Sequence, residues 1–215
     1  MDAVSFVRSN MSQIMTLAAE HLWLVGVSML FAILIGVPLG VVLVRRPGPS
    51  GALSKLVLGG ANIMQTVPSL ALFGFLLPLP WLGARADRLA IVALTLYALL
   101  PILRNTYTGI RGVDPAVREA AVGMGMTDLQ LLLEVELPLA MAVILAGIRV
   151  AAVTSVGVAT IAAAVGAGGL GEFIFRGLAS VSNPLILAGA VPAALLALLV
   201  DALLGVAERR LRVQR

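Results

Sequence analysis

Residues 119–138 read EAAVGMGMTDLQLLLEVELP and place four acids, two glycines and a threonine between two long apolar runs. The start of this stretch belongs to a helix that its flanking residues predict. Asp114 is a good N-cap, and Pro115 suits the first helical position, where its missing N–H leaves no bond unmade. A helix should run from 115 to about 124, and Gly125 can end it by adopting the left-handed conformation.

A second helix should follow this glycine turn. Thr127-Asp128-Leu129-Gln130 has the T-x-x-Q form of a capping box, and the apolar residues after it meet Pro138 at the next long apolar run. Glu134 and Glu136 stand on opposite sides of this helix and share no buried pocket, so no catalytic carboxylate pair is expected. Small residues on the first helix would let another backbone pack closely: Ala116, Ala120 and Ala121.

The composition places this helical hairpin in a membrane protein. Hydrophobic residues make up 60% of the 215 residues and charged residues 12%, against about 25% charged in soluble domains. The basic residues lie at the ends of apolar runs rather than in an aromatic-rich patch, so nucleic-acid binding is not predicted. One histidine, one lysine and no cysteine exclude an HExxH zinc site, a Walker A loop and thiolate chemistry. We expect no catalytic residue, no metal site and no cofactor bound by this chain.

Five apolar runs reach the length of about 20 residues that a helix needs to cross a bilayer. They cover residues 22–44, 56–79, 89–108, 139–165 and 185–206, and Arg45-Arg46-Pro47-Gly48-Pro49 should stop the first. We predict an all-α membrane protein with three parts. Residues 1–21 form an extracytoplasmic segment with a short interfacial helix, residues 22–208 a transmembrane domain that includes the loop 112–138, and residues 209–215 a basic cytoplasmic tail.

The basic residues predict the orientation, because cytoplasmic loops carry an excess of Lys and Arg. With the N-terminus outside, ten of the 15 basic residues fall inside and four outside, while Arg149 lies in or near the fourth span. The inside set is Arg45, Arg46, Lys55, Arg104, Arg111, Arg118, Arg209, Arg210, Arg212 and Arg215, and the outside set is Arg8, Arg85, Arg88 and Arg176. We therefore expect a cytoplasmic hairpin and a cytoplasmic C-terminus.

The hairpin carries residues at fixed spacing: Glu119-Ala120-Ala121, then Gly125, Val135 and Leu137-Pro138. This pattern resembles the EAA motif of bacterial ABC importer permeases, with Val135 in place of the more usual isoleucine. The resemblance implies a type I ABC importer permease fold in the bacterial cytoplasmic (inner) membrane. It also implies that the hairpin is the coupling helix seated in a cytoplasmic ATPase. The residues implied for this coupling are Glu119, Ala120, Ala121, Gly125, Leu137 and Pro138.

Other segments are similar to permeases for glycine betaine, choline and carnitine. These are residues 65–72, QTVPSLAL, and residues 166–177, GAGGLGEFIFRG, and Asp201 ahead of Glu208-Arg209-Arg210 also fits. The resemblance covers about residues 20–210. It implies an ATPase dimer that holds ATP and Mg²⁺, a second permease copy that is identical or homologous, and an extracytoplasmic substrate-binding protein.

Polar residues interrupt the second span and are candidates for a translocation path: Asn62, Gln65, Thr66, Pro68 and Ser69. Proline kinks a helix, and opened backbone in a transporter can line a cavity. The alternative is a structural kink whose freed backbone groups bond to local hydroxyls. Asn62 and Gln65 share a helical face and could equally bind a neighbouring helix.

Two ionisable residues stand at membrane depth, Arg149 in the fourth span and Asp201 in the fifth. Such residues are functional by default or are each other's partners. Glu172 is either a solvated loop residue or a contact for a docking protein. We expect His21 to be interfacial and Trp81 to belong to the outer aromatic belt.

The leading functional interpretation is an ATP-driven importer subunit for a quaternary ammonium solute such as glycine betaine, choline or carnitine. Aromatic cages recognise such groups, and only 5% of the chain is aromatic, so the binding protein should supply the selection. The alternatives are a permease for another small solute such as an amino acid, a stand-alone secondary transporter or channel, and a membrane-embedded enzyme. A secondary transporter would be expected to carry a mid-membrane array of acids, and an enzyme more His, Cys and Lys.

Overall fold

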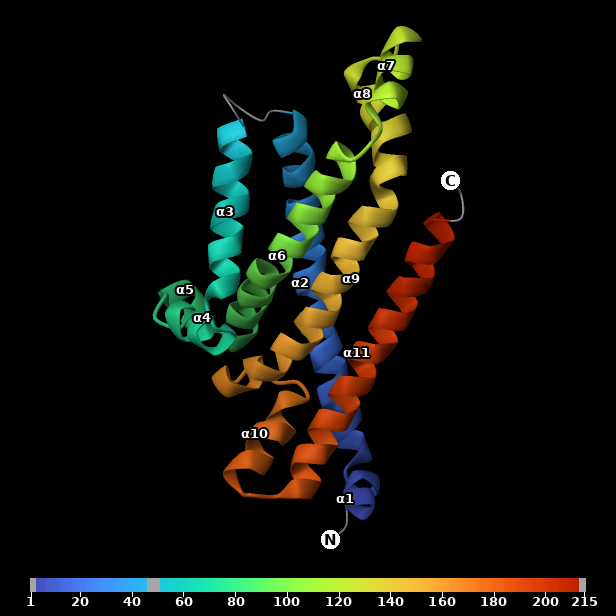
Figure 1. The fold of residues 1–215 in the computed structure, drawn as a ribbon. Coiled ribbons are helices and arrows are strands. Elements are labelled where there is room, and N and C mark those ends of the chain that lie inside the picture. Colours follow the sequence, from blue (N-terminus) through green and yellow to red (C-terminus); the bar gives the residue numbers. More distant parts are fainter. Residues whose placement is uncertain (1–2, 46–50, 213–215) are drawn as a thin grey trace.

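The computed structural model describes residues 3–45 and 51–212, which form a long helical bundle with the first helix at one pole and the helical hairpin of residues 115–130 at the other (Figure 1). Arg46-Pro47-Gly48-Pro49, predicted to stop the first span, lies outside the described residues, as do the last three residues of the predicted tail. The rest of that tail continues the last helix.

Within the described residues, four helices are long and apolar enough to cross a membrane, and one bent helix pair would make a fifth span. The bounds are α1 Ala3–Ser9, α2 Met11–Arg45, α3 Ala52–Thr66, α4 Ser69–Leu76, α5 Pro80–Gly83, α6 Ala86–Arg111, α7 Pro115–Gly123, α8 Asp128–Gln130, a π-helical segment Leu131–Glu136, α9 Leu137–Ala162, a 3₁₀ turn Ala163–Val165, α10 Gly171–Ala179 and α11 Asn183–Arg212. The all-α prediction is confirmed, and the apolar runs lie on helices.

The first helix departs from its prediction because it begins at Met11, well before residue 22. Its extra turns are held by tertiary contacts: Ile14 and Leu17 are buried in a cluster with Phe173. His21, expected to be interfacial, is fully buried, and its Nε2 lies 3.0 Å from the Val156 carbonyl oxygen. The expected short helix is present as α1, but the residues after it belong to the bundle.

The second apolar run, 56–79, is interrupted where the sequence predicted a proline kink, and α3 and α4 meet there at an angle of 101°. The break falls at Val67 and Pro68, both of which have extended backbone. Proline cannot donate a helical hydrogen bond, and it disfavours helical geometry in the residue before it, so two adjacent residues leave the helix together. The chain turns sharply near the middle of the bundle instead of crossing it in one piece (Figure 1).

The core lies around α6, which packs against α2 on one side and α9 on the other. Its inward residues are almost all small or aliphatic, including Leu89, Ala93 and Ile102, none of which has exposed surface. α11 packs outside α9, and α10 closes the pole that holds the N-terminus. In the most apolar 18-residue stretch of each helix, only 33% of the α2 residues and 17% of the α11 residues are buried. Both helices therefore offer wide apolar outer faces.

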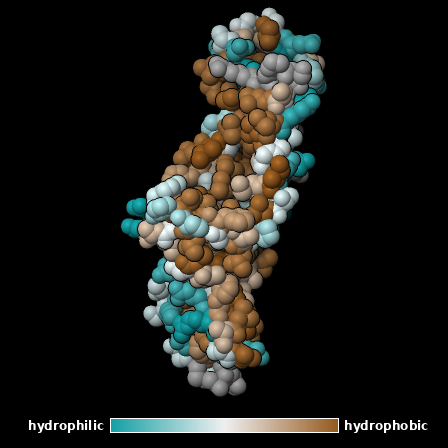
Figure 2. All heavy atoms as spheres, turned by 90° about the vertical axis from the view of Figure 1, so that its left-hand side faces the viewer, coloured by the Kyte–Doolittle hydropathy of each residue, from teal (hydrophilic) through white to brown (hydrophobic). Residues whose placement is uncertain are grey.

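The surface agrees with a bilayer-spanning bundle. Figure 2 shows brown, apolar residues along the middle section and teal residues gathered at the pole that carries α7 and α8 and again lower in the view. Trp81 on α5 is 66% exposed, as an aromatic-belt residue would be. The α7–α8 pole also holds the end of α2, the start of α3 and the C-terminal part of α11 (Figure 1).

The close approach of α6 and α9 depends on Gly147. A Cβ at this position would lie 2.5 Å from the Asn105 Cβ and 2.7 Å from the Pro101 carbonyl oxygen, and backbone cannot move aside cheaply. We expect Gly147→Ala to destabilise the chain by about 1–3 kcal/mol, as overpacking does. Thermal unfolding of the purified protein in detergent measures this. Gly157→Ala is the matched control on the same helix, because a Cβ added there would meet no neighbouring atom within 4 Å, and an equal effect of both substitutions would contradict the packing argument.

Candidate functional site

The hairpin begins with the cap that the sequence predicted. The Asp114 carboxylate accepts a hydrogen bond from the Ala116 backbone N–H at 2.9 Å, and Pro115 occupies the first helical position. The cap fixes the direction in which α7 leaves the end of α6. The observed bounds, Pro115–Gly123, agree with the predicted helix from 115 to about 124.

Gly125 ends α7 as predicted, with φ +85°. Its N–H donates to the Val122 carbonyl, and the Met126 N–H donates to the Ala121 carbonyl, which together make a Schellman motif. The following capping box is also present: the Thr127 N–H donates to Gln130 Oε1 at 2.9 Å, and the Thr127 hydroxyl oxygen accepts from the Gln130 N–H. Local chemistry alone therefore sets both ends of the turn.

The second helix meets Pro138 at the start of the fourth apolar run, as expected, and runs past it without a break. α8, the π-helical segment and α9 form one helix from Asp128 to Val165. Inside it the Leu137 N–H bonds to the carbonyl of Leu132, five residues back, immediately before a proline that has no N–H to offer. A π turn widens the helix locally, so the chain passes the proline without a break. The hairpin is thus a rigid extension of a bilayer-crossing helix.

The residues predicted for ATPase coupling do not all face outward. Glu119, Ala120, Gly125 and Pro138 are exposed. Ala121 is 2% exposed, so its methyl packs inside the hairpin, and the low-profile alanine face that we predicted is divided between the two sides. Beside Glu119, α7 and its turn present a cluster of exposed apolar side chains: Val117, Val122 and Met124.

A buried carboxylate at the base of the hairpin joins three elements. Glu136, only 4% exposed, accepts a 2.6 Å hydrogen bond from Arg45 at the end of α2, and Arg118 Nε of α7 lies 3.0 Å from its other oxygen. Arg118 also donates to the Ile110 carbonyl near the end of α6. We call Glu136, Arg45 and Arg118 the hairpin triad. It ties α7 to the bundle at one point.

The hairpin triad was not predicted from the sequence, and the expectation that Glu136 lies in no buried pocket is wrong. The three residues are far apart in the chain, and the alternation of Glu134 and Glu136 shows only that one of them can face inward. The paired charges explain why an acid is tolerated there, because a buried carboxylate needs a partner and hydrogen bonds.

Side chains of α6 and α3 satisfy the broken second span. Gln65 Nε2 donates to the Tyr97 carbonyl at 3.2 Å, and the Tyr97 hydroxyl donates to the carbonyl of Val67, which the break leaves free. Thr66 Oγ1 donates to the Ile63 carbonyl at 2.7 Å. These bonds favour the two structural alternatives. The kink is stabilised by nearby side chains, and Gln65 binds the neighbouring helix α6. Asn62 and Pro68 remain exposed and Ser69 half-buried, so they stay candidates for the path.

The two ionisable residues at membrane depth are brought together. Arg149 Nε and NH2 donate to the two oxygens of Asp201 at 2.7 and 2.8 Å, which is bidentate geometry. Glu208, which sequence reasoning mentioned without a role, is mostly buried and accepts from Arg149 NH1 at 3.2 Å. The spacing of Glu208 and Asp201 could have predicted this contact, because residues seven apart lie on the same face of a helix. The three charges join α9 to α11 beside a hollow of about 400 Å³.

The hairpin triad predicts a stability difference between two neighbouring acids. Glu136→Gln would leave Arg118 without its countercharge and Arg45 with only the exposed Asp128, 3.8 Å away. Losing one partner of a buried pair costs about 3–5 kcal/mol, and the partial exposure of both arginines reduces our expectation to about 1–3 kcal/mol. Thermal unfolding in detergent is the measurement. The control is Glu134→Gln, an exposed acid two residues away, and the triad has no structural role if both variants unfold alike.

The Arg149–Asp201 pair predicts that Asp201→Asn lowers the unfolding temperature and weakens the packing of α11 on α9. We expect the decrease to be small, because solvent screens the pair: the Arg149 side chain is 34% exposed and the Asp201 side chain 41%. Asp87→Asn, which removes the acid of an exposed pair with Arg85, is the control and should change little. An Asp201→Asn protein with unchanged stability and assembly would show that the pair is dispensable.

Comparison with known proteins agrees with this architecture. Residues 32–213 match the family described as binding-protein-dependent transport system inner membrane component. The carnitine transport permease protein OpuCB of Listeria monocytogenes is 44% identical over 98% of this chain and 94% of its own length. The choline transport system permease protein OpuBB of Bacillus subtilis is 44% identical, with 97% and 93% covered.

A solved structure of the MetNI methionine ABC transporter in an inward-facing conformation superposes with a TM-score of 0.82 at 27% identity, covering 94% of this chain and 97% of that chain. The shared fold thus agrees with sequence similarity over almost the full length. The chain belongs to the family of binding-protein-dependent transport system inner membrane components.

Proposed function

We propose that this chain is the transmembrane subunit of an ATP-driven importer for a quaternary ammonium solute such as glycine betaine, choline or carnitine. The support for this class of solute is the 44% identity to permeases named for carnitine and choline and to the osmoprotectant import permease protein OsmW of Salmonella typhimurium, 94% of which the match covers. An amino acid is the second candidate, because the MetNI methionine transporter has the same fold at lower identity.

The observation that carries the proposal is the exposed end of the hairpin. Glu119 and the apolar side chains of Val117, Val122 and Met124 stand in the open at one pole. In a monomer this surface has no use, whereas an acid surrounded by apolar groups is what a protein partner with a basic, apolar cleft would bind. The partner in our proposal is a dimeric cytoplasmic ATPase that holds ATP and Mg²⁺, with no nucleotide bound by this chain.

The remaining parts of the proposed complex follow from the bundle itself. The wide apolar faces of α2 and α11 leave room for lipid and for a second permease copy, and the path would form between the copies near the α3–α4 break. The N-terminus would lie outside and the hairpin inside, as the distribution of basic residues indicates. A binding protein would deliver solute to the pole with α10 and Glu172.

Movement of the hairpin would reach the membrane through two rigid connections. The hairpin continues without interruption into α9, and the hairpin triad ties it to α2 and to the end of α6. A pull on α7 by the ATPase would therefore tilt these helices together. That is the kind of domain motion by which transporters alternate access around a fixed site.

The coupling role predicts that Glu119→Ala and Gly125→Ala each lower ATP-driven uptake by about tenfold or more. The first removes an exposed contact, and the second strains a left-handed backbone position that holds the turn. Uptake of labelled glycine betaine, choline and carnitine into liposomes containing permease, ATPase and loaded binding protein is the measurement. Glu134→Ala, an exposed acid on the stem, is the control. Solute flux by this chain alone in ATP-free vesicles would overturn the proposal.

A further inference from the structure

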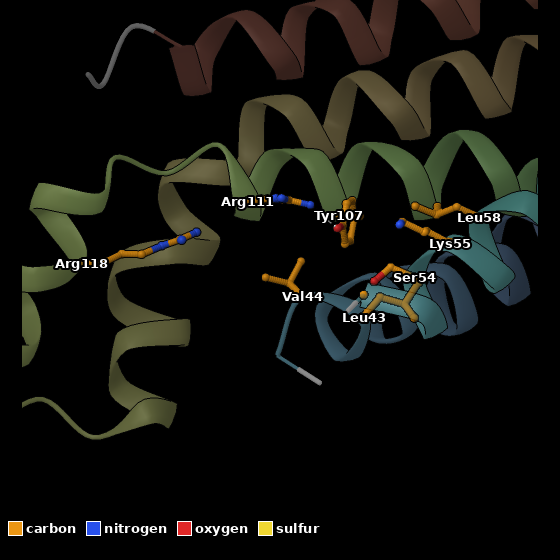
Figure 3. A pocket seen from close by; sticks show the side chains of 9 residues that line it. Leu43, Val44, Ser54, Lys55, Leu58, Tyr107, Arg111 and Arg118 are labelled. Carbon is orange, nitrogen blue, oxygen red and sulfur yellow. Dashed lines mark hydrogen bonds between the residues drawn. The ribbon is translucent and has the colours of Figure 1, made fainter. Parts of the chain in front are cut away.

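A cationic cavity lies beside the hairpin, apart from the surface proposed to bind the ATPase. It measures about 540 Å³, between the end of α2, the start of α3 and the last turns of α6 (Figure 3). Leu43 and Val44 line it from α2, Ser54, Lys55 and Leu58 from α3, and Tyr107 and Arg111 from α6. Gly51 and Arg118 complete the lining.

The charge of this cavity is not balanced. Among the described residues that line it there are three cations, Lys55, Arg111 and Arg118, and no acid. Arg118 forms an ion pair with Glu136, but neither Lys55 nor Arg111 forms one within residues 3–45 and 51–212. Arg111 instead donates to the Tyr107 hydroxyl at 2.6 Å, which leaves both positive charges available to a ligand.

A buried hydroxyl in the wall gives an independent sign of a missing ligand. Ser54 is 4% exposed, and its Oγ has no hydrogen-bond partner among the described residues. Leaving a buried polar group unpaired costs free energy, and native proteins rarely do so without an ion, water or ligand. In Figure 3, Lys55 extends from α3 toward Tyr107 on α6, on the same side of α3 as Ser54. A donor hydroxyl beside two unpaired cations suits an oxyanion.

The apolar walls identify the kind of molecule that carries this oxyanion. Leu43, Val44 and Leu58 line the same cavity, and exposed Leu53 and Leu56 follow on the outer side of α3. The volume exceeds what a phosphate ion fills. An amphiphile can place a phosphate among the basic groups and its acyl chains along α3. Basic pockets between helix ends at the cytoplasmic surface are typical sites for anionic lipid headgroups.

We propose that this cavity binds the phosphate headgroup of an anionic phospholipid, held by Lys55, Arg111 and the Ser54 hydroxyl. With the orientation proposed above, the lipid comes from the cytoplasmic leaflet. It occupies the junction of α2, α3 and α6 next to Arg118, so it fills a gap between the hairpin triad and the broken second span. The binding itself needs neither the ATPase nor transport, so its test is separate from that of the proposed function.

The test measures lipid binding to the purified full-length chain by native mass spectrometry and by thermal stabilisation in detergent. We expect phosphatidylglycerol to bind and to raise the unfolding temperature, whereas phosphatidylcholine does not. Lys55→Gln with Arg111→Gln should weaken phosphatidylglycerol binding about 25-fold, because each basic side chain near an anionic lipid contributes about a factor of five. The control, Arg209→Gln with Arg210→Gln, removes the same charge from exposed positions on α11 and should leave binding within about twofold.

Ser54→Ala separates ligand binding from folding. Without lipid this variant should be as stable as the wild type or more stable, because it removes an unsatisfied hydroxyl, yet it should bind phosphatidylglycerol more weakly. Three results would overturn the proposal. The first is equal binding of both lipids, the second is an equal loss in the α11 control, and the third is equal stabilisation by inorganic phosphate alone, which would make the ligand a soluble anion.

Discussion

Hydrocarbon offers no hydrogen-bond partners, and every backbone amide in this chain that enters a bilayer must find one within the protein. Regular helices meet this demand by themselves over most of the sequence. The exception at Val67 and Pro68 shows its force, because the freed carbonyl of Val67 is bonded by the Tyr97 hydroxyl and the neighbouring Gln65 reaches the backbone of α6. Two polar side chains, Gln65 on α3 and Tyr97 on α6, therefore make the sharp bend tolerable and fix α3 against the central helix.

Charges in the bundle obey the same demand. Arg149 at membrane depth is neutralised by Asp201 and Glu208, and Glu136 by Arg45 and Arg118. Each cluster joins helices that are distant in sequence, so each determines how two or three elements sit relative to one another. The cavity near Lys55 and Arg111 departs from this rule, and that departure is what identifies it as a place for an external anion.

Features that depend on neighbouring residues in the chain could be predicted from the sequence. The cap at Asp114, the left-handed Gly125 and the capping box at Thr127 are local hydrogen-bonding devices, and long apolar runs are sufficient to locate spans. Features that depend on distant partners could not. The burial of His21 and Glu136 requires knowing which helices meet, and the hydrogen bond to the carbonyl freed at the 101° bend comes from Tyr97, thirty residues beyond Val67. The π turn before Pro138, which lets the helix continue, has no signal in the local sequence.

The continuous helix from Asp128 to Val165 has a mechanical consequence. Glu136 and Arg149 stand on it thirteen residues apart, about 20 Å along a helical axis, and each is fastened to a different helix. A tilt of this single helix displaces Glu136 and Arg149 at once, so the ion pairs couple the movement of α2 to that of α11. Because this helix is held by two clusters of ion pairs, a small sideways movement of the hairpin tip becomes a coordinated rearrangement along the length of the bundle.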